Sequence, residues 1–138
     1  MSARVILTYD DYAALPDDGR RYELYDGEVI VVPAPFPGHP RVTAHVADLL
    51  REYAKTTGGL ALSAPLNIVL SEHNVVQPDV VFFSPERRQL VKDWEVTRSA
   101  PDLAVECCRN RRSCATVVER WICSHGSVWQ STGSSIPS

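Results

Sequence analysis

Residues 21–32 read RYELYDGEVIVV, two β-rich runs separated by the pair Asp26-Gly27. An Asp-Gly pair between two such runs is among the strongest local hairpin signals, because a type I′ turn needs positive φ at both central positions. The stretch therefore predicts an antiparallel hairpin with strands at 21–25 and 28–32. Just upstream, Thr8 and Asp11 form the pattern of a capping box with Asp in place of Glu, which predicts a short helix through about Ala14.

The sequence after the hairpin alternates between helical and strand patterns. A proline-punctuated loop precedes a predicted helix at about 40–56, whose apolar stripe consists of Val42, Val46, Leu49, Leu50 and Tyr53. Two predicted strands follow at about 60–70 and 75–83, joined by a turn at 71–74, and a last strand covers 101–106. A short helix is expected between the second and the last of these strands, after Ser84-Pro85, which is an N-cap followed by a first-turn proline.

This order of elements predicts a mixed central sheet flanked by helices, of α+β or α/β class. A length of 138 residues predicts one domain, and an apolar fraction of 44% with 22% charged residues argues against a disordered or fibrous chain. No apolar run approaches the roughly 20 residues that cross a bilayer. The apolar patch in the first residues is too short for a signal peptide, so we expect a cytoplasmic domain without a membrane partner.

The composition changes abruptly after Glu106. Residues 1–106 contain no cysteine and carry 10 Lys and Arg against 16 Asp and Glu, whereas residues 107–138 hold all four cysteines, four arginines and one acid. The two parts therefore have net charges of −6 and +3. We interpret residues 1–106 as the folded core and residues 107–138 as a separate tail that is poorly ordered.

Two acids occupy unusual positions in predicted strands. Asp79 lies in VVQPDVVFF with apolar neighbours along the chain, and Glu106 ends the strand LAVE. A buried, unpaired carboxylate costs several kcal/mol, so such a group usually has a partner or a metal; the alternative for each acid is a solvent-open edge position. Two carboxylates on neighbouring strands can together hold Mg²⁺, which prefers oxygen ligands and keeps several waters.

Several motifs in order resemble the Uma-two-type restriction endonuclease family, a branch of the PD-(D/E)XK nuclease superfamily. The resemblance covers about residues 7–106 and rests on residues 20–28 (RRYELYDGE), 33–35 (PAP) with His39, 64–66 (APL), 76–79 (VQPD) and 100–106 (APDLAVE). It implies a restriction-endonuclease-like core with a metal-dependent phosphodiesterase site. Asp79 and Glu106 match the family's metal-binding acids, with Mg²⁺ or Mn²⁺ as the implied cofactor. Glu23 matches a further family acid and is expected to be an auxiliary catalytic residue, unless it merely pairs with Arg20 or Arg21.

The chain departs from the family pattern after Glu106. The family continues with a segment that contains a catalytic lysine, whereas no lysine follows Lys92 here. In a reading frame shifted from Glu106 onward, suitable codons can encode a family-like segment, lysine included. In that frame, the codon that spans Cys107-Cys108 must encode leucine, and the codon that spans Trp121-Ile122 must encode aspartate. We therefore interpret residues 107–138 as an out-of-frame tail on a truncated family member. Such a truncation is expected to cause low solubility or self-association, so the chain could form a homo-oligomer.

Other chemistry-bearing residues give weaker signals. The tail cysteines and His125 lack the spacing of a zinc site. His39 is expected to be a solvent-exposed loop residue, although it could cap the helix or approach a phosphate, and His73 looks inert in a turn. Arg87-Arg88 could contact a nucleic-acid backbone, but the net charge of −6 in the core is no footprint of tight DNA binding.

The sequence therefore predicts a metal-dependent endonuclease that acts on nucleic acid, with DNA as the expected substrate. We expect the activity to be impaired, because the catalytic lysine is absent. The alternatives are a non-catalytic interaction module that keeps the fold and a non-functional fragment.

Overall fold

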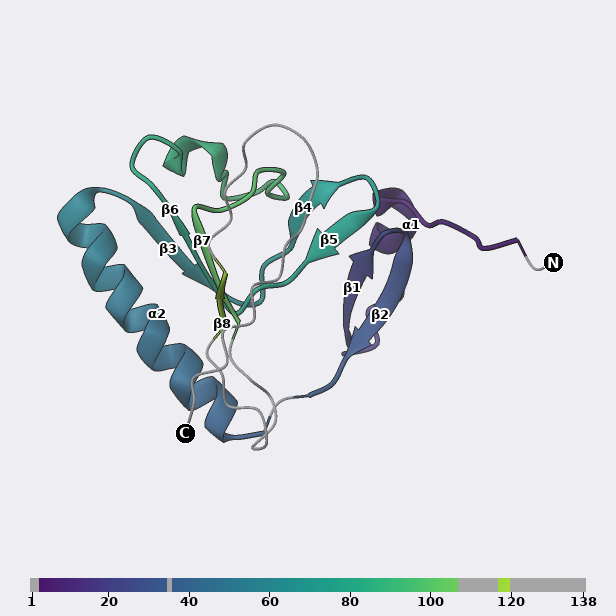
Figure 1. Ribbon diagram of the computed structural model, residues 1–138, viewed down its shortest axis with the longest axis horizontal. Coiled ribbons are helices and arrows are strands. Elements are labelled where there is room, and N and C mark those ends of the chain that lie inside the picture. Colours follow the sequence, from purple (N-terminus) through teal and green to yellow (C-terminus); the bar gives the residue numbers. More distant parts are fainter. Residues whose placement is uncertain (1–2, 35, 107–116, 120–138) are drawn as a thin grey trace.

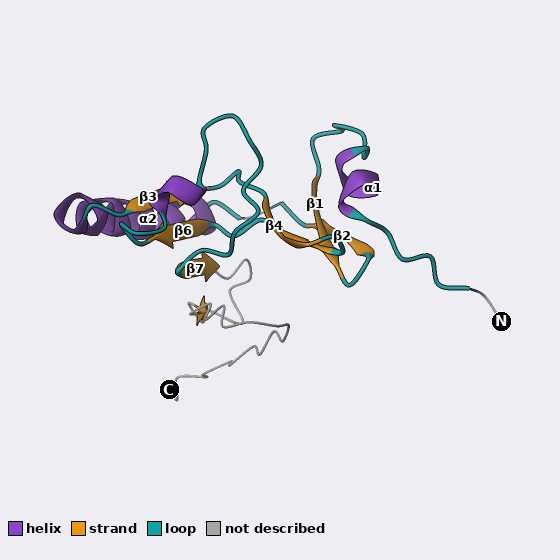
Figure 2. Cartoon of the chain, turned by 90° about the horizontal axis from the view of Figure 1, so that it is seen from above, coloured by secondary structure: helices purple, strands orange, loops and turns teal. Residues whose placement is uncertain are grey.

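The computed structural model describes residues 3–34 and 36–106, together with the backbone of residues 117–119 (Figure 1). The elements in chain order are α1 (Tyr9–Ala13), β1 (Arg21–Tyr25), β2 (Glu28–Val32), α2 (Gly38–Thr57), β3 (Leu60–Ser63), β4 (Ile68–Ser71), β5 (Asn74–Val76), β6 (Val80–Phe83), the 3-10 helix η1 (Arg88–Leu90), β7 (Leu103–Glu106) and β8 (Val117–Glu119). They form two four-stranded sheets, of strand order β2-β1-β5-β4 and β3-β6-β7-β8. In Figure 2, α2 lies with β3 and β6 at one end of the molecule, and α1 lies with β1 and β2 at the other.

The first hairpin and the first helix form as predicted. Asp26 and Gly27 have φ values of 46° and 78°, as a two-residue type I′ turn requires. Thr8 and Asp11 form the capping box of α1: the side chain of Thr8 accepts from the N–H of Asp11, and that of Asp11 accepts from the N–H of Thr8. Tyr12 from α1 packs against Leu24, Val69 and Val75, which attaches the helix to the first sheet.

Helix α2 spans the predicted region but buries a different face. It packs on the second sheet through Ala47, which contacts Val80 and Val105, and through Ala54, which contacts Phe82. Of the predicted stripe, Val46 and Leu50 are partly buried at this contact, whereas Val42, Leu49 and Tyr53 are exposed. The prediction of that stripe was therefore partly wrong, because small alanines let the helix approach the sheet closely and leave the larger residues at its sides.

Each of the two long predicted strands is broken into two. The segment at 60–70 becomes β3 and β4, and the segment at 75–83 becomes β5 and β6. The breaks contain Pro65 and Pro78, which have no N–H for a ladder hydrogen bond. Strands β3 and β6 pair in the second sheet while β4 and β5 pair in the first, so one bent hairpin connects both sheets.

The α+β class is confirmed, but the predicted single mixed sheet is divided. All ladders of the described residues are antiparallel, and a single bridge between Ile68 and Thr97 is parallel. The two halves of the bent hairpin share a core in which Ile68 and Val76 meet Val81, Phe83 and Ala104. This core surrounds the point where the chain crosses between the sheets.

The backbone of β8 pairs with β7 from Ala104 to Glu106. Strand β7 therefore has a neighbour on each side, β6 and β8. The predictions for residues 107–116 and 120–138, including the out-of-frame tail and the unlikelihood of a zinc site there, lie outside the described residues.

Asp102, just before β7, provides a first test of the fold. Its carboxylate accepts from the N–H of Ser84 at 2.7 Å and pairs with Arg87 Nη1 at 3.2 Å. Partial burial alone would raise the pKa of Asp102, but these two partners outweigh burial and hold the pKa below its usual value of 3.8. A lowered pKa in the folded state means that the stabilisation is present above 3.8 and is lost as the pH falls through the folded-state pKa.

Replacing Asp102 with asparagine is therefore expected to lower the free energy of unfolding by about 0.5–1 kcal/mol at neutral pH, allowing for partial exposure. Urea denaturation should show the difference shrinking as the pH falls well below 3.8. The exposed Asp93→Asn serves as the control and should have no such effect. A loss of equal size at neutral and acidic pH would show that the charge of Asp102 is not what stabilises the fold.

Candidate functional site

Asp79 lies at the break between β5 and β6 and is buried, with 2% of its surface exposed. Its Oδ2 atom is 3.0 Å from Nε2 of His39, and its Oδ1 atom is 3.7 Å from Nη1 of Arg21. The second distance is an ion pair too long for a hydrogen bond. One oxygen of the carboxylate thus contacts α2, and the other oxygen contacts β1 of the first sheet.

His39 is buried rather than exposed, and the prediction of an exposed loop histidine was wrong. The residue lies in the first turn of α2, where its N–H donates to the carbonyl of Phe36 at 3.0 Å. Helix α2 begins two residues earlier than predicted, at Gly38, and this turn directs the imidazole to Asp79. Sequence reasoning missed the pair because nothing in the local pattern shows that residues 39 and 79 meet.

Arg21 holds the segment that carries Asp79. Its Nε atom donates to Oε1 of Gln77 at 2.7 Å, and its Nη2 atom donates to the backbone carbonyl of Gln77. With the ion pair to Asp79, all three nitrogens of the guanidinium face residues 77 and 79. Arg21 therefore links the first sheet to the break between β5 and β6.

Glu23 has a different environment from the predicted arginine pair. Its Oε1 atom accepts from the N–H of Gln77 at 2.8 Å, and its Oε2 atom accepts from the hydroxyl of Tyr25 at 2.9 Å. Only 8% of Glu23 is exposed. Glu23 therefore contacts the backbone of Gln77, in the same Gln-Pro-Asp segment that carries Asp79.

The side chain of Gln77 joins a further, partly buried polar network. Its amide Nε2 donates to Oδ1 of Asn67 at 2.6 Å and to the hydroxyl of Tyr12 at 3.1 Å. The Tyr12 hydroxyl in turn donates to the carbonyl of Tyr22 at 2.8 Å. Burial raises the pKa of Tyr12, so the phenol remains a hydrogen-bond donor at neutral pH. This network fixes both sides of the crossing between the sheets.

Glu106 lies at the same end of the second sheet as Asp79. Val80 is the register partner of Val105, and the N–H of Asp79 also bonds the carbonyl of Val105, at 3.1 Å. The backbone of Asp79 is therefore attached to β7 at the residue that precedes Glu106. Glu106 is the next residue along β7 and is exposed, whereas Asp79 is buried.

The remaining predicted candidates serve the fold. His73 Nδ1 lies 2.8 Å from the carbonyl of Leu7, which attaches the N-terminal segment to the β4-β5 turn. Arg87 bonds the carbonyl of Ala100 as well as Asp102, and Arg88 bonds the carbonyl of Gly58. These contacts give both arginines structural partners.

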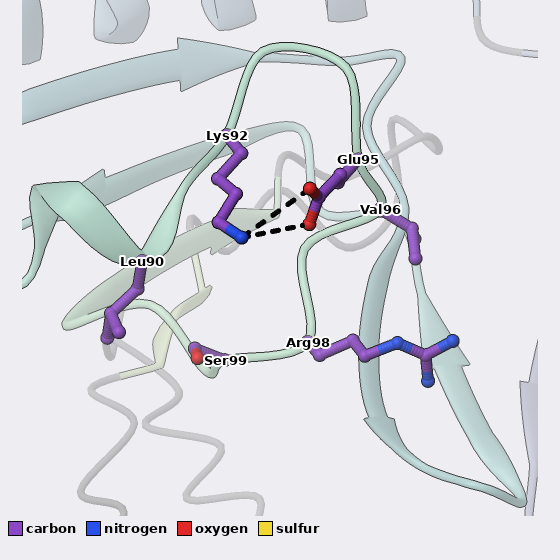
Figure 3. A pocket seen from close by; sticks show the side chains of 6 residues that line it. All are labelled: Leu90, Lys92, Glu95, Val96, Arg98 and Ser99. Atoms are coloured by element: carbon purple, nitrogen blue, oxygen red, sulfur yellow. Dashed lines mark hydrogen bonds and ion pairs between the residues drawn. The ribbon is translucent and has the colours of Figure 1, made fainter.

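Within the described part of the chain, no three His, Cys, Asp or Glu side chains are grouped as a metal site. An open surface hollow of about 400 Å³ lies elsewhere, along the segment after η1 (Figure 3). It is lined by Leu90, Lys92, Glu95, Val96, Arg98 and Ser99, and Lys92 and Glu95 pair across its rim. The hollow includes none of the acids around Gln77.

Among the described residues, no helix is long and apolar enough to cross a membrane.

One solved structure, titled as that of a "putative nuclease belonging to DUF820" from Anabaena variabilis ATCC 29413, matches with a TM-score of 0.62 and 22% sequence identity. The match covers 74% of this chain but only 58% of that one, so it shows a shared fold over part of a longer relative. No functionally curated protein matches the sequence significantly.

The model of the Uma2 family, described as "Putative restriction endonuclease", matches residues 9–110. These residues run from α1 past the end of β7 and include Glu23, Asp79 and Glu106. Because the match covers well over half of the 138 residues, the chain belongs to the Uma2 family.

Proposed function

We propose that the chain is a metal-dependent endonuclease fold that hydrolyses phosphodiester bonds in nucleic acid, with Asp79 and Glu106 as ligands of Mg²⁺ or Mn²⁺. The observation that carries the proposal is the position of Asp79, a buried carboxylate whose backbone N–H bonds β7 at Val105, one residue before Glu106. Membership of the Uma2 family, whose description names restriction endonucleases, supports the reaction class.

The residues present fit a hard divalent cation. Asp79 directly precedes β6 and Glu106 ends the adjacent strand β7. Mg²⁺ is commonly bound by one or two carboxylates, with waters and substrate phosphates completing its shell. A site with two protein carboxylates is therefore compatible with the lack of a three-residue cluster in the described part of the chain. The bound ion would supply Lewis acidity toward a phosphoryl group.

The groups around Asp79 define what the protein itself contributes. Arg21 and His39 place a cation and an imidazole against the carboxylate, and both are of a kind that binds phosphate oxygens. Glu23 and Gln77 fix the backbone that carries Asp79. Because residues 1–106 have a net charge of −6, we expect binding of DNA to depend on the divalent ion.

A second candidate function is a non-catalytic interaction module. It is favoured by the lack of any lysine after Lys92, since the resemblance implies a lysine that assists the attacking water. The side chains that pair with Asp79 include an arginine and a histidine. The same observation leads us to expect weak nuclease activity if activity is present.

Thermal unfolding with and without Mg²⁺ tests the metal site. Saturating ion at about 100 times its Kd stabilises a protein by roughly 2.7 kcal/mol, so we expect an upward shift in Tm of several degrees. Asp79→Asn should remove this shift, and the exposed Glu86→Gln, which keeps both ligands, should retain it. A wild-type protein that shows no response to Mg²⁺ or Mn²⁺ would favour the interaction module.

Nicking of supercoiled plasmid by the purified chain tests the reaction. We expect slow, metal-dependent nicking that is lost in Glu106→Gln and retained in Glu86→Gln. Nicking that persists unchanged in Glu106→Gln would exclude Glu106 as a ligand, and metal binding without nicking would indicate a site that has lost its chemistry.

A further inference from the structure

Among the described residues, no strand pairs with the outer edge of β2. In the strand order β2-β1-β5-β4 it is the outermost strand, and no described residue forms a ladder with its far side (Figure 1). Its sequence EVIVV contains no lysine, proline or glycine, and Ile30 and Val31 are 43% and 48% exposed. Edge strands of monomeric proteins usually carry charges, prolines or bulges that prevent pairing, and β2 has one charge, Glu28, which is paired with Arg4 at 3.1 Å.

The register of the hairpin identifies which backbone groups face this edge. Tyr25 and Glu28 close the two-residue turn, so they form a hydrogen-bonded pair, and such pairs alternate along an antiparallel ladder. Ile30 opposite Glu23 and Val32 opposite Arg21 are therefore also hydrogen-bonded to β1. The N–H and C=O groups of Val29 and Val31 point the other way, toward the open edge.

We propose that β2 pairs with β2 of a second copy of this chain, antiparallel and about a two-fold axis at Ile30. In this register Val29 of each copy faces Val31 of the other, so that all the outward groups of both residues are bonded. The pattern is self-complementary because its two outward-facing residues lie symmetrically on either side of Ile30. The sheet β2-β1-β5-β4 of one copy and the same sheet of the second copy then form one continuous eight-stranded sheet.

Neighbouring registers leave polar groups without partners. An axis at Val31 would place Val29 opposite Pro33, which has no N–H. An axis at Val29 would place Val31 opposite Gly27, whose N–H and C=O are already bonded to His73 and Leu7. The register about Ile30 avoids both defects.

Side chains agree with the same register. Ile30 meets its own copy in a non-hydrogen-bonded pair, where opposing side chains are closest. Glu28 falls opposite Val32, so no like charges are brought together along the strand. The two exposed apolar residues of β2 become contacts within the joined sheet.

Disulfide cross-linking tests the register in the full chain with its four cysteines replaced by serine. We expect Ile30→Cys to form a covalent dimer on mild oxidation, because identical residues on the axis come within disulfide distance. Val31→Cys is the matched control: it is similarly exposed but faces Val29 of the second copy, so it should cross-link at least tenfold more slowly. Equal rates for the two variants, or no cross-linking of Ile30→Cys, would overturn the proposal.

Sedimentation measures the association of the two copies without any introduced cysteine. The wild-type chain should sediment at twice its mass of 15.3 kDa, and Val31→Pro should sediment as a monomer. This proline removes an outward N–H and leaves the ladder to β1 intact; Val31→Thr keeps the N–H and should remain dimeric. A monomeric wild type, or a folded Val31→Pro that stays dimeric, would contradict β2 pairing, and the cross-linking result decides if Val31→Pro does not fold.

Discussion

Replacing Arg21 with methionine is expected to lower the free energy of unfolding by about 3 kcal/mol, the cost of breaking a buried ion pair from one side. Arg21 is 25% exposed at its side chain and Asp79 only 3%. Without the guanidinium, Asp79 keeps the imidazole of His39 but loses its neighbouring cation, and both oxygens of Gln77 lose a donor. Urea denaturation monitored by circular dichroism measures the loss.

Arg20→Met is the matched control for this prediction. Arg20 is the preceding residue, its side chain is 66% exposed, and it pairs with Asp18 at 3.5 Å. Exposed pairs contribute about 0–1 kcal/mol, so this change should be small. The loss caused by Arg21→Met should also shrink in an Asp79→Asn background, because the buried charge is then absent. Additive effects would mean that Arg21 acts through Gln77 alone.

The effect of Mg²⁺ on the same variant links stability to the proposed function. Arg21 and a divalent ion both place positive charge beside the Asp79 carboxylate. If Asp79 is a metal ligand, Arg21→Met should gain more stability from Mg²⁺ than the wild type does. An unchanged or smaller gain would separate the arginine from the metal site while leaving its structural role intact.

Local elements could be predicted because a few residues determine each one. The Asp26-Gly27 turn and the Thr8 capping box depend on backbone preferences of adjacent residues, and the structure confirms both. The C-terminus of α2 at Gly58, with φ of 83°, follows from the same kind of rule. These signals are insensitive to what packs against them.

The division into two sheets could not be predicted from the same patterns. Residues 60–70 and 75–83 each have continuous strand-forming composition, and Pro65 and Pro78 do not reveal whether a strand merely bends or changes its partner. Only the long-range pairing of β3 with β6 and of β4 with β5 shows that the hairpin belongs to both sheets. Partner choice is a tertiary property.

The sequence indicated that Asp79 needs a partner, but it did not indicate which residues provide one. Asp79 was identifiable because a carboxylate between apolar runs needs a partner. His39 and Arg21, which provide those partners, lie 40 and 58 residues away in sequence, and no periodicity connects them to Asp79. The burial of His39 arises from the turn that starts α2, two residues before the predicted boundary.

Replacing Glu23 with leucine is expected to lower the free energy of unfolding by roughly 3 kcal/mol, because the N–H of Gln77 and the hydroxyl of Tyr25 then lose their charged acceptor in a buried place. Glu23→Gln keeps an oxygen for the Gln77 N–H and should lose about 1 kcal/mol. Glu28→Gln, on the neighbouring strand with an exposed side chain, should change stability little.

The glutamine variant also separates the two roles considered for Glu23. A folded Glu23→Gln that retains Mg²⁺ stabilisation and nicking would show that the residue positions the Gln77-Pro78-Asp79 segment through its hydrogen bonds. A folded Glu23→Gln that binds the ion but does not nick would show that the negative charge itself is needed in the reaction. Since Glu23 accepts from the N–H of Gln77, which precedes Pro78 and Asp79, we expect the first result, in which Glu23 positions the carboxylate of Asp79 without touching the ion.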